Sequence, residues 1–202
     1  MIRKMGYVQK TILVMMILIQ TNLLFSQKKL SKDTLFYKTD STLRWRDFKG
    51  HSIPSAAATA DSYISIYANA KPNVKTNSED LYIYPVFLKK KSWYKSAADT
   101  TEYLLKHEQL HFDIAELVCR MIRKELKQEF GNSFDNYQKR YEKILNKYLK
   151  QYTKMSEDYD NETSHSLNMA KQKEWNDKIK QMLDDLSEYS APVVSIDLNK
   201  FK

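Results

Sequence analysis

Residues 104–112 read Leu104-Leu105-Lys106-His107-Glu108-Gln109-Leu110-His111-Phe112 and contain the pattern HExxH. On an α-helix, residues four apart lie on the same face, so His107 and His111 can bind one metal ion together. Glu108 lies about 100° around the helix from His107, close enough to reach a water molecule held by that ion. Two neutral imidazoles, an open coordination position and a nearby carboxylate are what a zinc hydrolase needs. The stretch therefore predicts a helix that binds Zn²⁺, with Glu108 as the general base.

The residues around HExxH repeat at the three- and four-residue steps of an amphipathic helix. The apolar stripe comprises Tyr103, Leu104, His107, His111, Ile114, Val118 and Met121. The alternative interpretation is a core helix that carries two histidines by chance, but burying two unliganded imidazoles is costly. The presence of Glu108 also favours catalysis, because a structural zinc site closes with four protein ligands and needs no base.

Two acidic residues on the same helix point the wrong way to complete the site. Glu116 lies about 180° from His107 and about 140° from His111, at about 100° per residue. Asp113 lies about 120° and about 160° from the same two histidines. While the helix stays regular, neither carboxylate can face the metal ion.

The third ligand must therefore come from another segment. The extended pattern HExxHxxGxxH is absent, since Ile114 and Leu117 occupy its glycine and histidine positions. A second predicted helix after Ser133 would form a hairpin with the first and return the chain toward the histidines. We expect His165, in the loop after that hairpin, to be the third ligand, and Glu162 is the alternative because a carboxylate completes many zinc sites.

Several segments along the chain match a known pattern. They are 43–50 (Leu43-Arg44-Trp45-Arg46-Asp47-Phe48-Lys49-Gly50), 56–59, Ser92-Trp93, 107–116, 159–165, Gln172 and Trp175. With them the chain resembles a bacterial domain-of-unknown-function family described as predicted secreted zinc-dependent proteases. The resemblance implies a zincin-like metallopeptidase, and it supports His165, which lies in a matching segment. The chain departs from the family pattern at Leu110 and Ser166, where glycine is usual.

The amino terminus has the composition of a secretory signal peptide. Residues 1–26 combine three positive charges (Arg3, Lys4 and Lys10) with an apolar run that ends at Ser26. Polar residues at positions 20–22 make the run short for a membrane span, although an uncleaved anchor is the alternative. We expect residues 27–202 to form a single domain, exported to the periplasm or the cell exterior, with no stable membrane span after cleavage.

The charge and cysteine content limit the possible partners and chemistry. The formal net charge is +8, and residues 1–26 contribute three of the 33 basic residues and none of the 25 acidic ones. The only basic triplet is Lys89-Lys90-Lys91, with no aromatic stacking motif beside it, so we predict no nucleic-acid binding. Cys119 is the single cysteine, which excludes an internal disulfide, and we expect it to pack in the core.

The hydrophobic pattern predicts an α+β fold. We expect strands around Leu43 and Trp45, at 62–68 and at 81–88, and a short strand or extended tail at 193–196. Pro85 indicates an edge strand or a bulge. We expect helices from Asp99 or Thr100 to about 130, from 133 to about 152, and from 165 to about 186, with a polar loop at 159–164. The result is a small antiparallel sheet followed by three helices, with HExxH on the first.

These features together predict a zinc-dependent hydrolase of a peptide or protein substrate in the cell envelope or outside the cell. Glu108 would accept a proton from the metal-activated water and pass it to the leaving amine. Tyr159 is a candidate donor to the oxyanion, with buried packing as its alternative role. The alternative function is a non-catalytic envelope protein with a structural zinc ion or a partner-binding cleft.

Overall fold

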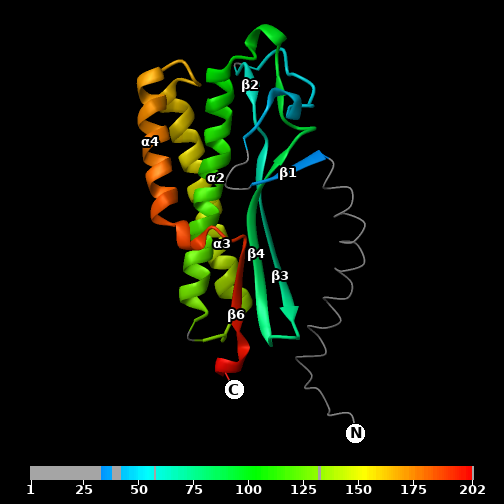
Figure 1. Cartoon of the computed structure of the whole chain (residues 1–202), viewed down its shortest axis with the longest axis vertical. Coiled ribbons are helices and arrows are strands. Elements are labelled where there is room, and N and C mark those ends of the chain that lie inside the picture. Colours follow the sequence, from blue (N-terminus) through cyan, green and yellow to red (C-terminus); the bar gives the residue numbers. More distant parts are fainter. Residues whose placement is uncertain (1–32, 38–41, 57, 132, 202) are drawn as a thin grey trace. The chain divides into compact units, whose positions relative to one another are not determined.

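The structure is a computed structural model of the chain (Figure 1), and it describes residues 33–37, 42–56, 58–131 and 133–201. The chain divides into two units, residues 1–34 and 35–202. Only Asp33 and Thr34 of the first unit are described, so the account below concerns the second. The predicted signal peptide, residues 1–26, lies outside the described residues.

A four-stranded antiparallel sheet is built around one long strand, β4. Its strands are β1 (Thr34–Phe36), β3 (Ile64–Asn73), β4 (Ser78–Leu88) and β6 (Val193–Asp197). β3 pairs with one edge of β4 along its whole length, and β6 pairs with the other edge over 78–82. The second sheet is small: β2 (Ala60–Asp61) pairs antiparallel with β5 (Trp93–Tyr94).

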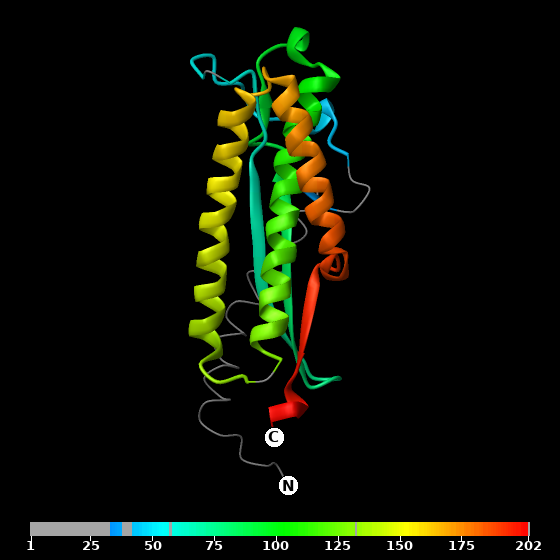
Figure 2. The ribbon, with the colours of Figure 1, turned by 90° about the vertical axis from the view of Figure 1, so that its left-hand side faces the viewer.

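Three helices cover one face of the larger sheet (Figure 1). They are α2 (Glu102–Glu129), α3 (Tyr137–Thr163) and α4 (Met169–Asp185). Figure 2 shows α2 between α3 and α4, with the sheet behind it. The predicted α+β architecture of a small antiparallel sheet and three helices is therefore confirmed. None of the helices in the described residues is both long enough and apolar enough to cross a membrane.

Helix α2 begins and ends as local chemistry requires. The Thr101 hydroxyl accepts a hydrogen bond from the Leu104 backbone N–H at 3.1 Å, so Thr101 is the N-cap in place of the predicted Asp99 or Thr100. The helix ends at Phe130, next to Gly131. Between these ends its buried residues contact all the surrounding layers, which explains why the apolar stripe is wide.

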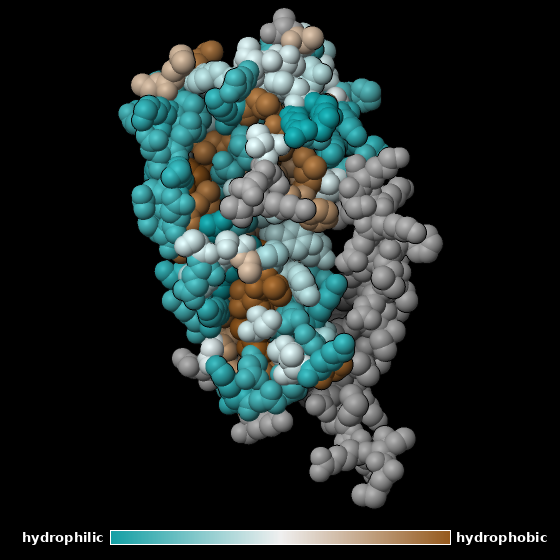
Figure 3. All heavy atoms as spheres, in the orientation of Figure 1, coloured by the Kyte–Doolittle hydropathy of each residue, from teal (hydrophilic) through white to brown (hydrophobic). Residues whose placement is uncertain are grey.

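The core consists of three apolar clusters that meet along α2. One lies against the sheet and α3, one against α3 and α4, and one at the amino-terminal end of α2. Their buried members include Leu81, Ile122, Leu126 and Phe130, then Ile114, Tyr159, Trp175 and Ile179, then Leu43, Phe48, Phe87 and Phe112. In the space-filling view of Figure 3, hydrophobic residues show in the seams while the outer face of the helices is mostly hydrophilic.

The strand predictions need two corrections. The segment around Leu43 and Trp45 is not a strand; it leads into a short 3₁₀ turn, Trp45–Asp47, and its apolar side chains pack against the core as a loop. Pro85 does not mark an edge strand, because β4 is the central strand. The Pro85 carbonyl accepts from the Tyr37 N–H at 3.4 Å, beyond the end of the β6 pairing, so its missing N–H costs the sheet little.

The third correction concerns α3. Residues 159–163, predicted as a polar loop, form the last turn of this helix. The helix then ends in a turn in which Ser164, His165 and Ser166 all have positive φ, 50°, 51° and 73°. Left-handed backbone is costly for residues with a side chain, so the turn is strained at three successive positions.

Candidate metal centre

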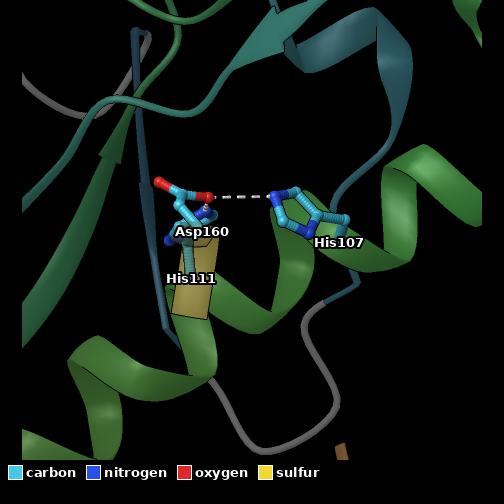
Figure 4. Close-up of side chains that lie close together, drawn as sticks. All are labelled: His107, His111 and Asp160. Carbon is cyan, nitrogen blue, oxygen red and sulfur yellow. Dashed lines mark hydrogen bonds and ion pairs between the residues drawn. The ribbon is translucent and has the colours of Figure 1, made fainter. Parts of the chain in front are cut away.

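Two helices bring a carboxylate between the two histidines of HExxH (Figure 4). His107 and His111 lie on α2, and Asp160 lies on α3. Asp160 Oδ1 is 3.2 Å from His107 Nε2 and 3.0 Å from His111 Nε2. Both histidines are buried, and the three potential ligand atoms all lie within 4.8 Å of one another. These three groups could hold a metal ion with two nitrogen ligands and one oxygen ligand.

The second ring nitrogen of each histidine is held by a neighbour. Gln172 Oε1 lies 2.9 Å from His107 Nδ1, and Ser156 Oγ lies 2.9 Å from His111 Nδ1. An amide oxygen only accepts, so His107 Nδ1 donates to Gln172, and Nε2 is the ring nitrogen that faces Asp160. Such outer hydrogen bonds fix the ring orientation that a metal ligand needs.

The donor set fits a metal ion. His107 Nε2 and the Asp160 carboxylate oxygen lie 3.2 Å apart, a separation that suits a shared cation, either a proton on Nε2 or a metal ion between the two atoms. Ligands about 2.0–2.2 Å from a tetrahedral zinc ion lie about 3.3–3.6 Å apart, slightly more than the 3.2 and 3.0 Å between Asp160 Oδ1 and the two imidazole nitrogens. Two imidazoles and one carboxylate also leave the fourth position open, as in catalytic zinc sites.

The electrostatics of the three groups are coupled. Burial acts to raise the pKa of Asp160, but its interactions with His107 and His111 outweigh burial and hold the pKa well below its usual range. Burial acts to lower the pKa of His111, and the hydrogen bond to Asp160 and the charge of Glu108 outweigh it, so that pKa is raised. Asp160 therefore stays ionised and attracts positive charge to this point.

Glu108 lies in the same cavity as the three candidate ligands. It is 3% exposed, and burial raises its pKa, although the charges of His111 and His107 oppose that shift. The cavity has a volume of about 210 Å³. Its walls come from residues 58–62, from α2, from α3 and from His165. A small molecule or an extended chain segment entering the cavity would meet Glu108 and the candidate ligands together.

Tyr159, predicted as a candidate oxyanion donor, lies behind the histidines. Its ring stacks on His107 with centroids 4.6 Å apart, and its hydroxyl is 2.6 Å from Gln172 Oε1 and 3.2 Å from the His107 carbonyl oxygen. Tyr159 is fully buried and is not among the residues that line the cavity. In this structure it supports the position of His107, and its role at an oxyanion stays a prediction.

The two residues predicted to supply the third ligand lie differently. The His165 side chain is 63% exposed at the cavity rim, with Nδ1 3.8 Å from Asp160 Oδ1. Glu162 accepts a hydrogen bond from Trp175 Nε1 at 3.0 Å. The structure groups neither of them with the two histidines; Asp160 takes that place. Ligation by His165 stays a prediction that competes with Asp160.

The sequence did contain a signal for Asp160. The helical stripe of α3 continues past Tyr152 through Met155 to Tyr159, which extends the helix by two turns. On that extension Ser156 and Asp160 are four residues apart and therefore share a face. The spacing has this meaning only if residues 159–163 are helical, and the sequence pattern predicts a loop there.

Comparison with known proteins adds a family but no activity. No curated protein and no solved structure matches the chain. One family match covers residues 73–166, which extend from the end of β3 to the turn after α3 and include HExxH and Asp160. Residues 73–166 of this chain match the bacterial family of unknown function DUF922.

Proposed function

We propose that this protein is a zinc-dependent peptide hydrolase with a zincin-like site. The observation that carries the proposal is the convergence of His107, His111 and Asp160 in one cavity with Glu108. Each of these groups has a place in one mechanism, and the mechanism needs no further side chain to begin. A structural zinc site would need a fourth protein ligand and would not need Glu108.

The residues divide the work of hydrolysis among them. His107, His111 and Asp160 would hold the ion, which supplies Lewis-acid chemistry by lowering the pKa of water and polarising a carbonyl. Glu108 accepts the proton of the attacking water at its carboxylate and delivers it to the leaving amine. Gln172 and Ser156 hold the two imidazoles in the orientation that the site requires.

The proposed substrate and location rest on the sequence. A peptide or protein substrate follows from the resemblance of the HExxH region to predicted secreted proteases. Export to the periplasm or the cell exterior follows from the signal-like residues 1–26. A hydrolase of cell-wall peptides uses the same amide chemistry, so the substrate panel must contain both classes.

The metal centre is tested by titrating zinc into the parent and into three variants, Asp160→Ala, His165→Ala and Glu162→Ala. We expect the parent to bind about one zinc ion per chain, and Asp160→Ala to bind it at least about 100-fold more weakly. Asp158→Ala is the matched control on the outer face of α3. If His165→Ala abolishes binding and Asp160→Ala does not, His165 is the third ligand and the set proposed here is wrong.

The activity is tested with Glu108→Gln, which removes the base and keeps the shape of the side chain. We expect zinc binding to persist and hydrolysis of any substrate found in a panel of peptides and cell-wall fragments to fall by about 10²–10⁴-fold. A variant that cleaves at the parental rate would contradict the proposed mechanism. A parent that binds zinc and cleaves nothing in the panel would favour the non-catalytic alternative.

A further inference from the structure

The cavity of this basic protein is lined by acidic residues and by no lysine or arginine. Its lining comprises Ala58, Thr59, Ala60, Asp61, Ser62, Leu104, His107, Glu108, His111, Tyr152, Ser156, Asp160 and His165. The chain as a whole has 33 lysines and arginines against 25 acidic residues. The distribution of charge around the cavity is therefore the reverse of that of the chain.

The mechanism proposed above uses two of the three carboxylates. Asp160 belongs to the candidate ligand set, and Glu108 is the base. A dication held by Asp160 and two neutral imidazoles leaves one net positive charge, which Glu108 balances. The carboxylate of Asp61 is then the unbalanced charge in the cavity, and neither ligation nor proton transfer explains it.

Asp61 lines the cavity from β2, and no lysine or arginine of the described residues lines the cavity beside it. The Trp93 side chain hydrogen bonds with its carboxylate, and the cationic group that acts on it is His111, which is neutral once it binds a metal ion. Asp61 pairs in register with Trp93 of β5, and its side chain is exposed to the cavity. The lysines that flank these strands are held elsewhere. Lys89 pairs with Asp47 at 2.9 Å, Lys91 lies over the Tyr63 ring at 4.3 Å, and Lys95 Nζ bonds the Ala56 carbonyl at 2.5 Å.

We propose that Asp61 binds a positively charged group of the substrate, an ammonium or a guanidinium, and so selects cationic peptides. The inference rests on the proposed function, because it takes the bound peptide to be a substrate. The binding preference itself needs no catalysis. Two sources supply the same chemistry: a lysine or arginine side chain, and a free amino terminus. The first would make the enzyme cut next to a basic residue, and the second would make it remove residues from the chain end.

The test measures peptide binding by calorimetry to the zinc-loaded parent chain, in which Glu108 keeps its charge, with peptides made uncleavable by N-methylated amide bonds. Three hexapeptides of otherwise identical, uncharged sequence are compared. The first peptide contains one lysine, and both of its ends are blocked. The second has norleucine in place of the lysine and also has both ends blocked. The third contains norleucine and has a free amino terminus. We expect at least one cationic peptide to bind about tenfold more tightly than the neutral one, and the preference to narrow in 0.5 M salt.

Asp61→Asn should remove the preference and leave the affinity for the neutral peptide unchanged. Asp61→Lys should reverse it, so that a peptide with glutamate in place of norleucine binds best. Asp158→Asn makes the same change of charge outside the cavity, where Asp158 pairs with Lys154 at 2.8 Å, and should leave the preference intact. Near-ultraviolet circular dichroism checks that each variant is folded.

The outcomes separate this inference from the proposed function. A cationic preference that depends on Asp61 supports the inference even if the parent chain cleaves no peptide. Cationic peptides that bind no better than the neutral one, or that bind no more tightly than the detection limit, overturn it. A preference that survives in the Asp61→Asn variant also overturns it, because another group must then supply the charge.

Discussion

Glu108 and Glu116 are both glutamates on α2 and are each 3% exposed, but only Glu116 is surrounded by arginines. Glu116 Oε1 accepts from Arg120 Nε at 2.9 Å and from Arg123 Nη2 at 2.6 Å. The two arginines also donate to the carbonyl oxygens of Leu183 and Ile83, so the triad ties α2 to α4 and to β4. Glu108 faces a cavity without any arginine or lysine.

The difference shows what a buried carboxylate is for. A carboxylate paired with two guanidiniums is neutralised and rigid, and it contributes to the fold. A carboxylate buried without a cation has a raised pKa and keeps its capacity to take a proton, at a cost in stability. α2 thus carries a structural acid, Glu116, and a candidate chemical acid, Glu108, on two different faces. Variants of these two residues and of a third buried carboxyl, Glu79 on β4, test that division.

The largest effect is expected from Glu116→Gln. The substitution leaves Arg120 and Arg123 buried and charged without a carboxylate, so we expect the free energy of unfolding to fall by about 3–5 kcal/mol. Urea denaturation at pH 7 measures it. Glu102→Gln, which removes an exposed pair with Lys106, is the control and should leave the free energy of unfolding nearly unchanged. A loss as small as that of the control would show that Glu116 is not the structural acid.

A somewhat smaller effect is expected from the pH dependence of Glu79, a third buried carboxyl. It lies on β4, is 6% exposed, and has its pKa raised to about 7 by burial and by the charge of Asp80. The folded state therefore holds the proton more tightly than the unfolded chain, whose pKa is about 4.5. Its contribution is complete below about pH 4.5 and is lost, by roughly 3 kcal/mol, as the pH rises to about 7.

Glu79→Gln should remove this component, so that the variant gains on the parent between pH 5 and pH 8 in urea denaturation with EDTA. The amide cannot ionise, so the cost of burying a charge disappears. Equal pH slopes for variant and parent would show that Glu79 has a partner in solution. Glu79 would then be a paired, structural carboxylate like Glu116.

The smallest effect is expected from Glu108→Gln in the metal-free protein. Because burial raises the pKa of Glu108, its ionised form costs stability above that pKa, and the neutral amide should raise the unfolding free energy at pH 8 by about 1 kcal/mol. Thermal unfolding in EDTA measures the change. A variant that is less stable than the parent would place Glu108 with the structural acid Glu116.

The sequence predicted the parts of the site that lie on one regular element. His107, Glu108 and His111 follow from helical spacing alone, and α2 has nearly the predicted ends. The same spacing places Glu116 on another face, where the structure pairs it with arginines. Local periodicity is sufficient whenever one helix carries the whole pattern.

The parts that join different elements were missed or left open. Asp160 is not predicted as a ligand from the sequence, because the predicted helix ends near residue 152. The two further turns of α3 bring the Asp160 carboxylate to the histidines. The strands β2 and β5 have two residues each, too few for any alternation to show, yet they set one wall of the cavity. The position of Asp61 in the cavity therefore could not be predicted from the sequence, since it depends on the pairing of β2 with β5, in which Asp61 faces Trp93.

The placement of α2 between the sheet and the other helices also has a kinetic consequence. The groups of the candidate centre are close in the sequence: His107 and Gln172, its most distant pair, are 65 residues apart, and helical hairpins connect them. The sheet closes over a longer range, since Ser195 on β6 bonds Asp80 on β4 across 115 residues. Contacts of long range form late because closing a long loop costs more entropy. We therefore expect the helical layer, with the groups of the candidate metal centre, to assemble before β6 joins the sheet.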